Sequence, residues 1–168
     1  MRQWILRILA FAALFAWMAV IFGFSAEDAE KSTKTSDGVI NDVAEVVVPE
    51  YKTYTEPEKA AFIDRMSHPV RKCAHFAEYA LLGVLAFLCT LTLPLHKKLR
   101  AIAALLFCFL YAALDEWHQS LSPGRSQQFT DVLIDTSGAF VGILLTLFVV
   151  FLLLRKKFQK PVDNHLTV

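Results

Sequence analysis

Long apolar runs alternate with shorter polar segments along this chain. Four of the runs reach the length of about 20 residues that a helix needs to cross the hydrocarbon core of a bilayer. None shows the period-2 alternation of a transmembrane β-strand. Apart from closed β-barrels, only helices can pair all of their backbone N–H and C=O groups in lipid. The pattern therefore predicts an all-α integral membrane protein, a four-transmembrane-helix bundle in a single domain over residues 1–168, with spans at 4–24, 74–95, 99–117 and 132–154.

Lysine and arginine residues gather at the ends of these predicted spans. An even number of spans brings all three basic groups to one side of the membrane, and loops rich in Lys and Arg face the cytoplasm. We therefore expect both termini, including the tail 155–168, to be cytoplasmic. The segment 26–70 and the loop 118–131 then lie outside. The basic groups are Arg2 and Arg7, then Lys97, Lys98 and Arg100, then Arg155, Lys156, Lys157 and Lys160.

The outer segment 26–70 carries helix signals of its own. The sequence Thr55-Glu56-Pro57-Glu58 predicts a helix start, with Thr55 as the cap and Glu58 reaching back to it. The apolar residues that follow could rest on the membrane surface. A weaker amphipathic segment covers 39–48. We expect an extracytoplasmic loop that contains short helices.

Composition supports a membrane protein and narrows the classes of function. The chain is 55% hydrophobic, which is more apolar surface than a soluble domain of 168 residues can bury. Its three cysteines lack the spacing of a zinc site or a disulfide framework. The basic residues form short clusters at span ends, so we expect no nucleic-acid partner. A signal peptide is the rival interpretation of 4–24, but this run exceeds the usual 7–15 apolar residues of such peptides.

Ionisable residues form three stripes near the predicted outer surface. Helical periodicity places Arg71, His75 and Glu78 on one face of the second span. The third span ends with Asp115, His118 and Gln119 on a common face, and Glu116 lies about a quarter-turn away. The fourth span starts with Asp131 and Asp135, one turn apart. Because all three stripes lie near the same surface, we predict that they converge in one pocket.

The fourth span also carries a packing motif. Its acidic face continues through Gly138 and Gly142, a GxxxG pair that permits close approach of another helix. A face built for such contact directs Asp131 and Asp135 into the bundle, because charges at membrane depth usually face a partner or a wet cavity. The turn at 122–125 would present Arg125 over the site, where its guanidinium could hold a carboxylate or phosphate.

Each stripe also has a structural interpretation. Arg71 and Lys72 could be interfacial anchors, and a single histidine such as His75 is more often a structural residue than a ligand or base. Glu78 and Asp135 lie one to two turns inside their helices, where they could form structural ion pairs. The coincidence of three polar stripes at one membrane surface favours a functional site.

Two sequence blocks resemble a known family. RKCAHFAEYALLG at 71–83 and DEWHQSLSPGRSQQFTDVLIDTSGAFVG at 115–142 look like the two signatures of the VanZ-like membrane proteins, named after a teicoplanin-resistance protein. FSAEDAEKSTKTS at 24–36 is similar to a serine-bearing stretch of the family, which often has glutamine at the position of Glu27. The resemblance implies the bacterial cytoplasmic (inner) membrane and a link to antibiotic resistance. It points to Arg71, Lys72, His75, Glu78, Asp115, Glu116, His118, Gln119, Arg125, Asp131 and Asp135.

These residues support functions of different classes. The favoured hypothesis is a binding protein whose outer polar pocket holds a membrane lipid, a lipid-linked envelope precursor or a glycopeptide-type amphiphile. The second is an interfacial enzyme, a hydrolase or transferase acting on a lipid-linked substrate, and the sequence leaves room for a divalent metal between facing helices. A proton-coupled transporter is a third hypothesis, and the chain could also oligomerise. The catalytic candidates are His75, Glu78, Asp115, Glu116 and His118.

Overall fold

The computed structural model describes residues 1–123 and 128–158, without the side chains of Arg2 and of residues 156–158. All regular secondary structure in these ranges is helical, which confirms the predicted all-α class. The elements are α1 (Arg2–Ser25), α2 (Ala29–Val47), the 3₁₀ turn η1 (Tyr51–Thr53), α3 (Glu56–Thr92), α4 (Lys97–Gln119) and α5 (Phe129–Phe158).

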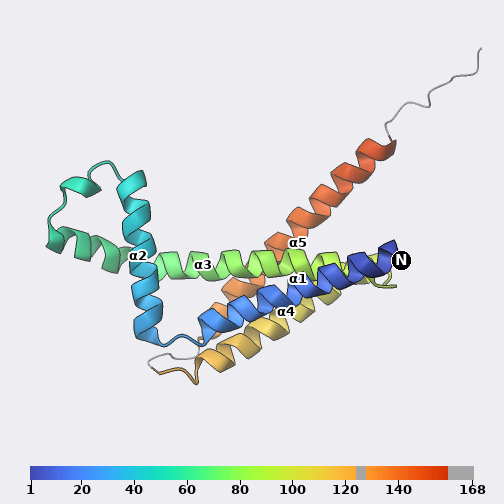
Figure 1. Cartoon of the computed structure of the whole chain (residues 1–168), viewed down its shortest axis with the longest axis horizontal. Coiled ribbons are helices and arrows are strands. Elements are labelled where there is room, and N and C mark those ends of the chain that lie inside the picture. Colours follow the sequence, from blue (N-terminus) through green and yellow to red (C-terminus); the bar gives the residue numbers. More distant parts are fainter. Residues whose placement is uncertain (124–127, 159–168) are drawn as a thin grey trace, which may run out of the picture.

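Three of the helices run side by side, and two cross them. Figure 1 shows α1, α3 and α4 along a common direction, with α5 crossing α3 obliquely. The helix α2 stands across one end of this bundle. The N-terminus, the connection between α3 and α4 and the end of α5 all lie away from α2 (Figure 1). The bundle therefore has two distinct ends, one covered by α2 and one bearing these chain ends and turns.

The predicted division between a surface helix after Thr55 and a span beginning near 74 is wrong. Both belong to α3, a continuous helix of 37 residues with Pro69 in its interior. The predicted cap is present, since the backbone N–H and the hydroxyl of Thr55 donate to Oε2 of Glu58 at 2.7 and 2.8 Å. Hydropathy marked a boundary where charged residues begin, but a helix continues through a change of polarity and needs a stop signal to end.

The segment before α3 is more helical than its sequence suggested. The helix α2 begins at Ala29, well before the predicted start at Val39, because Asp28 caps it by accepting a hydrogen bond from the Lys31 N–H at 2.7 Å. After α2, Tyr51 is fully buried and packs edge-on against Phe62 of α3, with ring centroids 5.3 Å apart. These contacts tie the N-terminal part of α3 to the preceding segment.

Three described helices are long and apolar enough to cross a membrane. These stretches are Gln3–Ser25 in α1, Glu56–Thr92 in α3 and Phe129–Arg155 in α5. The helix α4 is not among them, so the described helices confirm three of the four predicted spans by length and composition. Charged residues stand at both ends of α4, with Lys97, Lys98 and Arg100 in its first turn and Asp115 and Glu116 near its end.

The closest helix contact joins α3 and α5. A Cβ atom at Gly138 would overlap the carbonyl oxygen of Phe76, and one at Gly142 would overlap that of Ala80. On the facing helix, Gly83 stands in the same relation to the carbonyl of Ala139. The two backbones touch as the GxxxG spacing predicts. This contact fixes the acidic first two turns of α5 against the polar stretch of α3.

Candidate functional site

A pocket of about 170 Å³ lies at the end of the bundle that α2 crosses. It is formed by residues of α1, α2, α3 and α4 and by the short connection after α1. Its wall combines apolar and polar side chains. The apolar ones are Ile21, Phe24, Val39, Val70 and Ala74; the polar ones are Ser25, Glu27, Ser32, Thr35, Ser36, Arg71, His75, Glu78, Asp115 and Gln119.

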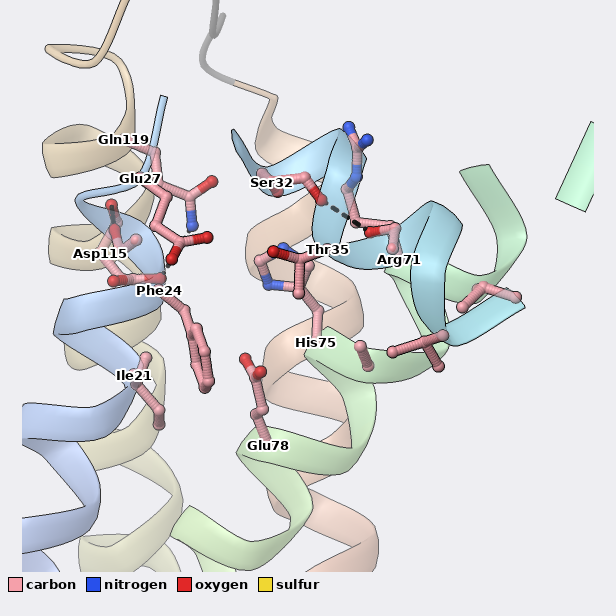
Figure 2. Close-up of a pocket in the computed structure, with 15 residues that line it drawn as sticks. Ile21, Phe24, Glu27, Ser32, Thr35, Arg71, His75, Glu78, Asp115 and Gln119 are labelled. Carbon is pink, nitrogen blue, oxygen red and sulfur yellow. Dashed lines mark hydrogen bonds between the residues drawn. The ribbon is translucent and has the colours of Figure 1, made fainter. Parts of the chain in front are cut away.

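The predicted stripe of α3 forms one side of this pocket. Arg71, His75 and Glu78 all line it, because their spacing places them on one helical face. Figure 2 shows His75 and Glu78 on α3 facing Asp115 and Gln119 on α4 across the pocket. The structure therefore brings together five of the residues that the sequence singled out.

The end of α4 supplies a group of buried polar side chains. Asp115, Glu116 and Gln119 are only 4%, 2% and 7% exposed. Gln119 donates from Nε2 to Oδ2 of Asp115 at 3.0 Å. The remaining oxygen of Asp115, Oδ1, is buried and accepts no hydrogen bond of normal geometry from the described residues, and the hydroxyls of Ser25 and Tyr79 lie near this carboxylate. Asp115 thus presents an unsatisfied acceptor at the pocket.

Glu116 has a different partner. Its Oε1 accepts a hydrogen bond from the backbone N–H of Gln128 at 2.5 Å. Since Gln128 directly precedes α5, this bond fastens the start of that helix to α4. Glu116 does not line the pocket. The contact of Glu116 with Gln128 therefore positions α5.

The two acidic residues of α5 lie behind the pocket rather than in its wall. Asp131 forms an ion pair with Lys72. Asp135 is 1% exposed, and its Oδ1 lies 3.6 Å from Nδ1 of His75. As the packing motif predicts, both carboxylates face the bundle. Lys72 therefore contacts another helix, an arrangement closer to the structural ion pair than to an interfacial anchor.

Acidic side chains dominate the electrostatics of this region. Asp135 lies within electrostatic reach of Asp115, Asp131, Glu116 and Glu78. Like charges held close together at low dielectric repel one another strongly, so added positive charge stabilises such a cluster. No group of three or more His, Cys, Asp or Glu among the described residues is arranged to hold a metal ion. The arrangement of the described residues therefore gives no support to the hypothesis of a divalent metal.

His118 is a predicted site residue that lies away from the pocket wall. His118 faces α1: its ring centroid is 4.3 Å from that of Phe22, and its Nδ1 is 3.3 Å from Oγ of Ser25. It does not line the pocket, although Ser25 does. Arg125 lies outside the described residues. In the structure the polar stripes of α3 and α4 meet in the pocket, whereas the acidic stripe of α5 lies behind the pocket wall.

The contribution of α2 was missed at the level of sequence. Ser32, Thr35, Ser36 and Val39 line the pocket from this helix, and Arg71 donates to the hydroxyl of Thr33 at 3.1 Å. The four lining positions have the i, i+3, i+4, i+7 spacing of one helical face. Starting the helix at the Asp28 cap, rather than at Val39, would have revealed this face.

An ion pair borders the pocket where α1 leads into α2. Lys31 contacts Glu27 at 2.9 Å, one turn apart in sequence. The hydrogen bond to Glu27, together with the charge of that carboxylate, raises the pKa of Lys31. Lys31 thus remains positively charged at neutral pH and offsets the charge of the one pocket acid that comes from this segment.

Comparison with known proteins assigns this chain to one family. The model of the VanZ/LLP1 family matches residues 10–153, a range that includes every residue of the pocket and the contact between α3 and α5. Searches of curated proteins and of solved structures found no match. With the family match extending from α1 into the last part of α5, this chain belongs to the VanZ/LLP1 family of membrane proteins.

Proposed function

We propose that this protein crosses the membrane four times and binds the head group of a cell-envelope amphiphile in the pocket beneath α2. The ligand would be a membrane lipid, a lipid-linked envelope precursor or a glycopeptide-type amphiphile. Binding would link the protein to tolerance of antibiotics or of envelope stress. The observation that carries the proposal is a pocket with both charged and apolar walls at one end of a bundle of apolar helices.

The outer face of α4 supports a fourth span. Its buried face contains small and polar residues, among them Ala104, Cys108 and Ala112. Its opposite face carries large apolar side chains at helical spacing, each more than half exposed. In water such a continuous stripe is unfavourable, whereas in a bilayer it meets lipid chains. The stripe comprises Leu99, Ile102, Leu106, Leu110, Leu114 and Trp117.

The positions of the basic residues support an outward-facing pocket. Arg7 lies near the start of α1, Lys97 and Lys98 begin α4, and Arg155 is near the end of α5. These helix ends all lie away from α2 and the pocket (Figure 1). Since basic residues favour the cytoplasmic side, the pocket end would face outward in the cytoplasmic membrane.

Cysteine labelling tests this topology. In a variant lacking Cys73, Cys89 and Cys108, we expect Val46→Cys to react with a membrane-impermeant maleimide in intact cells, because Val46 is 85% exposed on α2. Lys98→Cys should react only after lysis. Labelling of position 98 in intact cells, with position 46 protected until lysis, would show that the orientation is inverted.

The size and lining of the pocket define the part of the ligand that it can hold. A volume of about 170 Å³ accommodates a head group and not a complete amphiphile. Arg71 offers hydrogen-bond donors, Glu78 and Asp115 offer acceptors, and Ile21 with Phe24 offers an apolar wall. An amphiphile at the membrane surface presents the same combination, with a polar head beside an apolar chain. The chain would extend along the exposed apolar sides of the helices.

Filling the pocket tests whether it binds such a molecule. Ala74 and Ala77 are both exposed on α3, but only Ala74 lines the pocket. We expect Ala74→Leu to weaken binding of added envelope lipids on the order of ten- to a hundredfold, as steric overfilling costs about 1–3 kcal/mol. Native mass spectrometry in detergent measures retained lipid. Ala77→Leu is the matched control and should bind normally; equal lipid retention by both variants and the unaltered protein would count against the pocket.

A further inference from the structure

The pocket contains two unsatisfied polar groups of opposite kind. The Nε–H of Arg71 is buried and finds no acceptor in the described parts of the chain. The Oδ1 atom of Asp115 is buried and accepts no hydrogen bond of normal geometry from the described residues, as noted above. A buried polar group without a partner costs about 1–3 kcal/mol, and more when charged. A ligand that accepts a hydrogen bond from Arg71 and donates one to Asp115 would satisfy both.

These groups come from different walls of the pocket. Figure 2 shows Arg71 beside Thr35 and α2, with Asp115 on α4 across the pocket and Glu78 between the facing helices. The guanidinium is held in place by its Nη2 hydrogen bond to Thr33, and the Asp115 carboxylate by Gln119. Both groups are therefore oriented before any ligand arrives, which lowers the entropic cost of binding.

We infer that the pocket selects a zwitterionic head group in which a phosphate is joined through a short alkyl link to a primary ammonium. The phosphate would accept from Arg71, and the ammonium would donate to Asp115 and Glu78. This inference rests on the proposed function, since it names the head group that the same pocket takes. A phospholipid with an aminoalkyl phosphate head and a free aminoalkyl phosphate share this chemistry.

Charge decides against the simpler alternatives. A purely anionic head group would meet the carboxylates of Glu78 and Asp115, with Asp135 and Glu116 close behind them. A purely cationic one would meet Arg71. A quaternary ammonium carries no N–H, so it would leave Oδ1 of Asp115 without a donor. A head group with both charges and an N–H donor matches all of these groups, and its positive charge also offsets the neighbouring carboxylates.

Competition between lipids tests this inference on the full-length protein. Affinities would be measured in detergent by native mass spectrometry for phosphatidylethanolamine, phosphatidylcholine and phosphatidylglycerol with identical acyl chains. We expect phosphatidylethanolamine to bind at least about tenfold more tightly than either of the others, because a charge-assisted hydrogen bond contributes about 1.5–3 kcal/mol. Free phosphoethanolamine should compete, more weakly if the acyl chains also contact the protein.

Two substitutions assign the two ends of the head group. Asp115→Asn should reduce the preference for phosphatidylethanolamine over phosphatidylcholine, because an amide oxygen accepts the ammonium N–H more weakly than a carboxylate does, while Glu78 remains as an acceptor. Arg71→Gln should weaken all three phospholipids, while Arg65→Gln, at an exposed position earlier on α3, should change none. A melting curve for each variant shows that it is folded.

The possible results separate this inference from the proposed function. If the unaltered protein binds all three lipids equally and Ala74→Leu weakens them all, the pocket binds amphiphiles but the inference of a zwitterionic head group is wrong. A preference for phosphatidylglycerol has the same meaning. If Ala74→Leu changes no lipid affinity, both the inference and the proposed function fail. If free phosphoethanolamine competes as strongly as the lipid does, the soluble head group alone is a sufficient ligand.

Discussion

Replacing Gly142 with leucine should prevent α3 and α5 from packing and should remove most folded protein from the membrane. A side chain at this position would overlap the backbone carbonyl of Ala80, which cannot rotate away as a side-chain atom could. Overpacking a well-filled contact costs about 1–3 kcal/mol where side chains can adjust, and we expect the loss to reach or exceed the top of that range here. Thermal unfolding in detergent and the amount of protein accumulated measure it.

Gly23→Leu is the matched control for this variant. It makes the same substitution within a helix, but a Cβ atom at Gly23 meets no atom within 4 Å. Leucine has a higher helix propensity than glycine, so this variant should be as stable as the unaltered protein or slightly more so. Equal melting temperatures for Gly142→Leu and Gly23→Leu would show that α3 and α5 do not approach as closely as described.

Neutral replacement of the pocket residues should abolish function while leaving the fold intact. We expect His75→Asn, Glu78→Gln and Asp115→Asn each to lose the tolerance of antibiotics or envelope stress that the proposed function implies. Their melting temperatures should change little, because removing a buried charge can be neutral or even stabilising. Groups that are costly to bury persist at sites where they serve a function. Minimum inhibitory concentrations, measured beside melting curves, test both halves of this prediction.

Lys72→Gln is expected to behave differently from these three variants. Lys72 lies outside the pocket wall and pairs with Asp131, whose side chain is 13% exposed. Removing the cation leaves that carboxylate without its partner, so stability should fall before function does. Glu45→Gln, at an exposed position of α2, is the control and should change neither. If tolerance is lost only in those variants that also have a lower melting temperature or fail to accumulate, the polar residues stabilise the fold and do not form a functional site.

The sequence alone determined the features that depend on local periodicity. The apolar runs predicted helices, and the spacing of Arg71, His75 and Glu78 placed them on one face, where all three line the pocket. The glycine spacing predicted the contact of Gly138 and Gly142 with another helix. A helix repeats every 3.6 residues, so the relative directions of neighbouring side chains follow from numbering alone.

Only the tertiary structure decided which helices meet and where they end. Glu116 bonds to the backbone of Gln128, and His118 turns toward Phe22 on α1, although both belong to the same polar run. The cap at Asp28 extends α2, and this helix then crosses one end of the bundle and forms one wall of the pocket. Such outcomes depend on contacts between residues far apart in sequence and on hydrogen bonds at helix ends. Hydropathy records neither, because it measures the preference of each segment for lipid and not the partner that the segment finds.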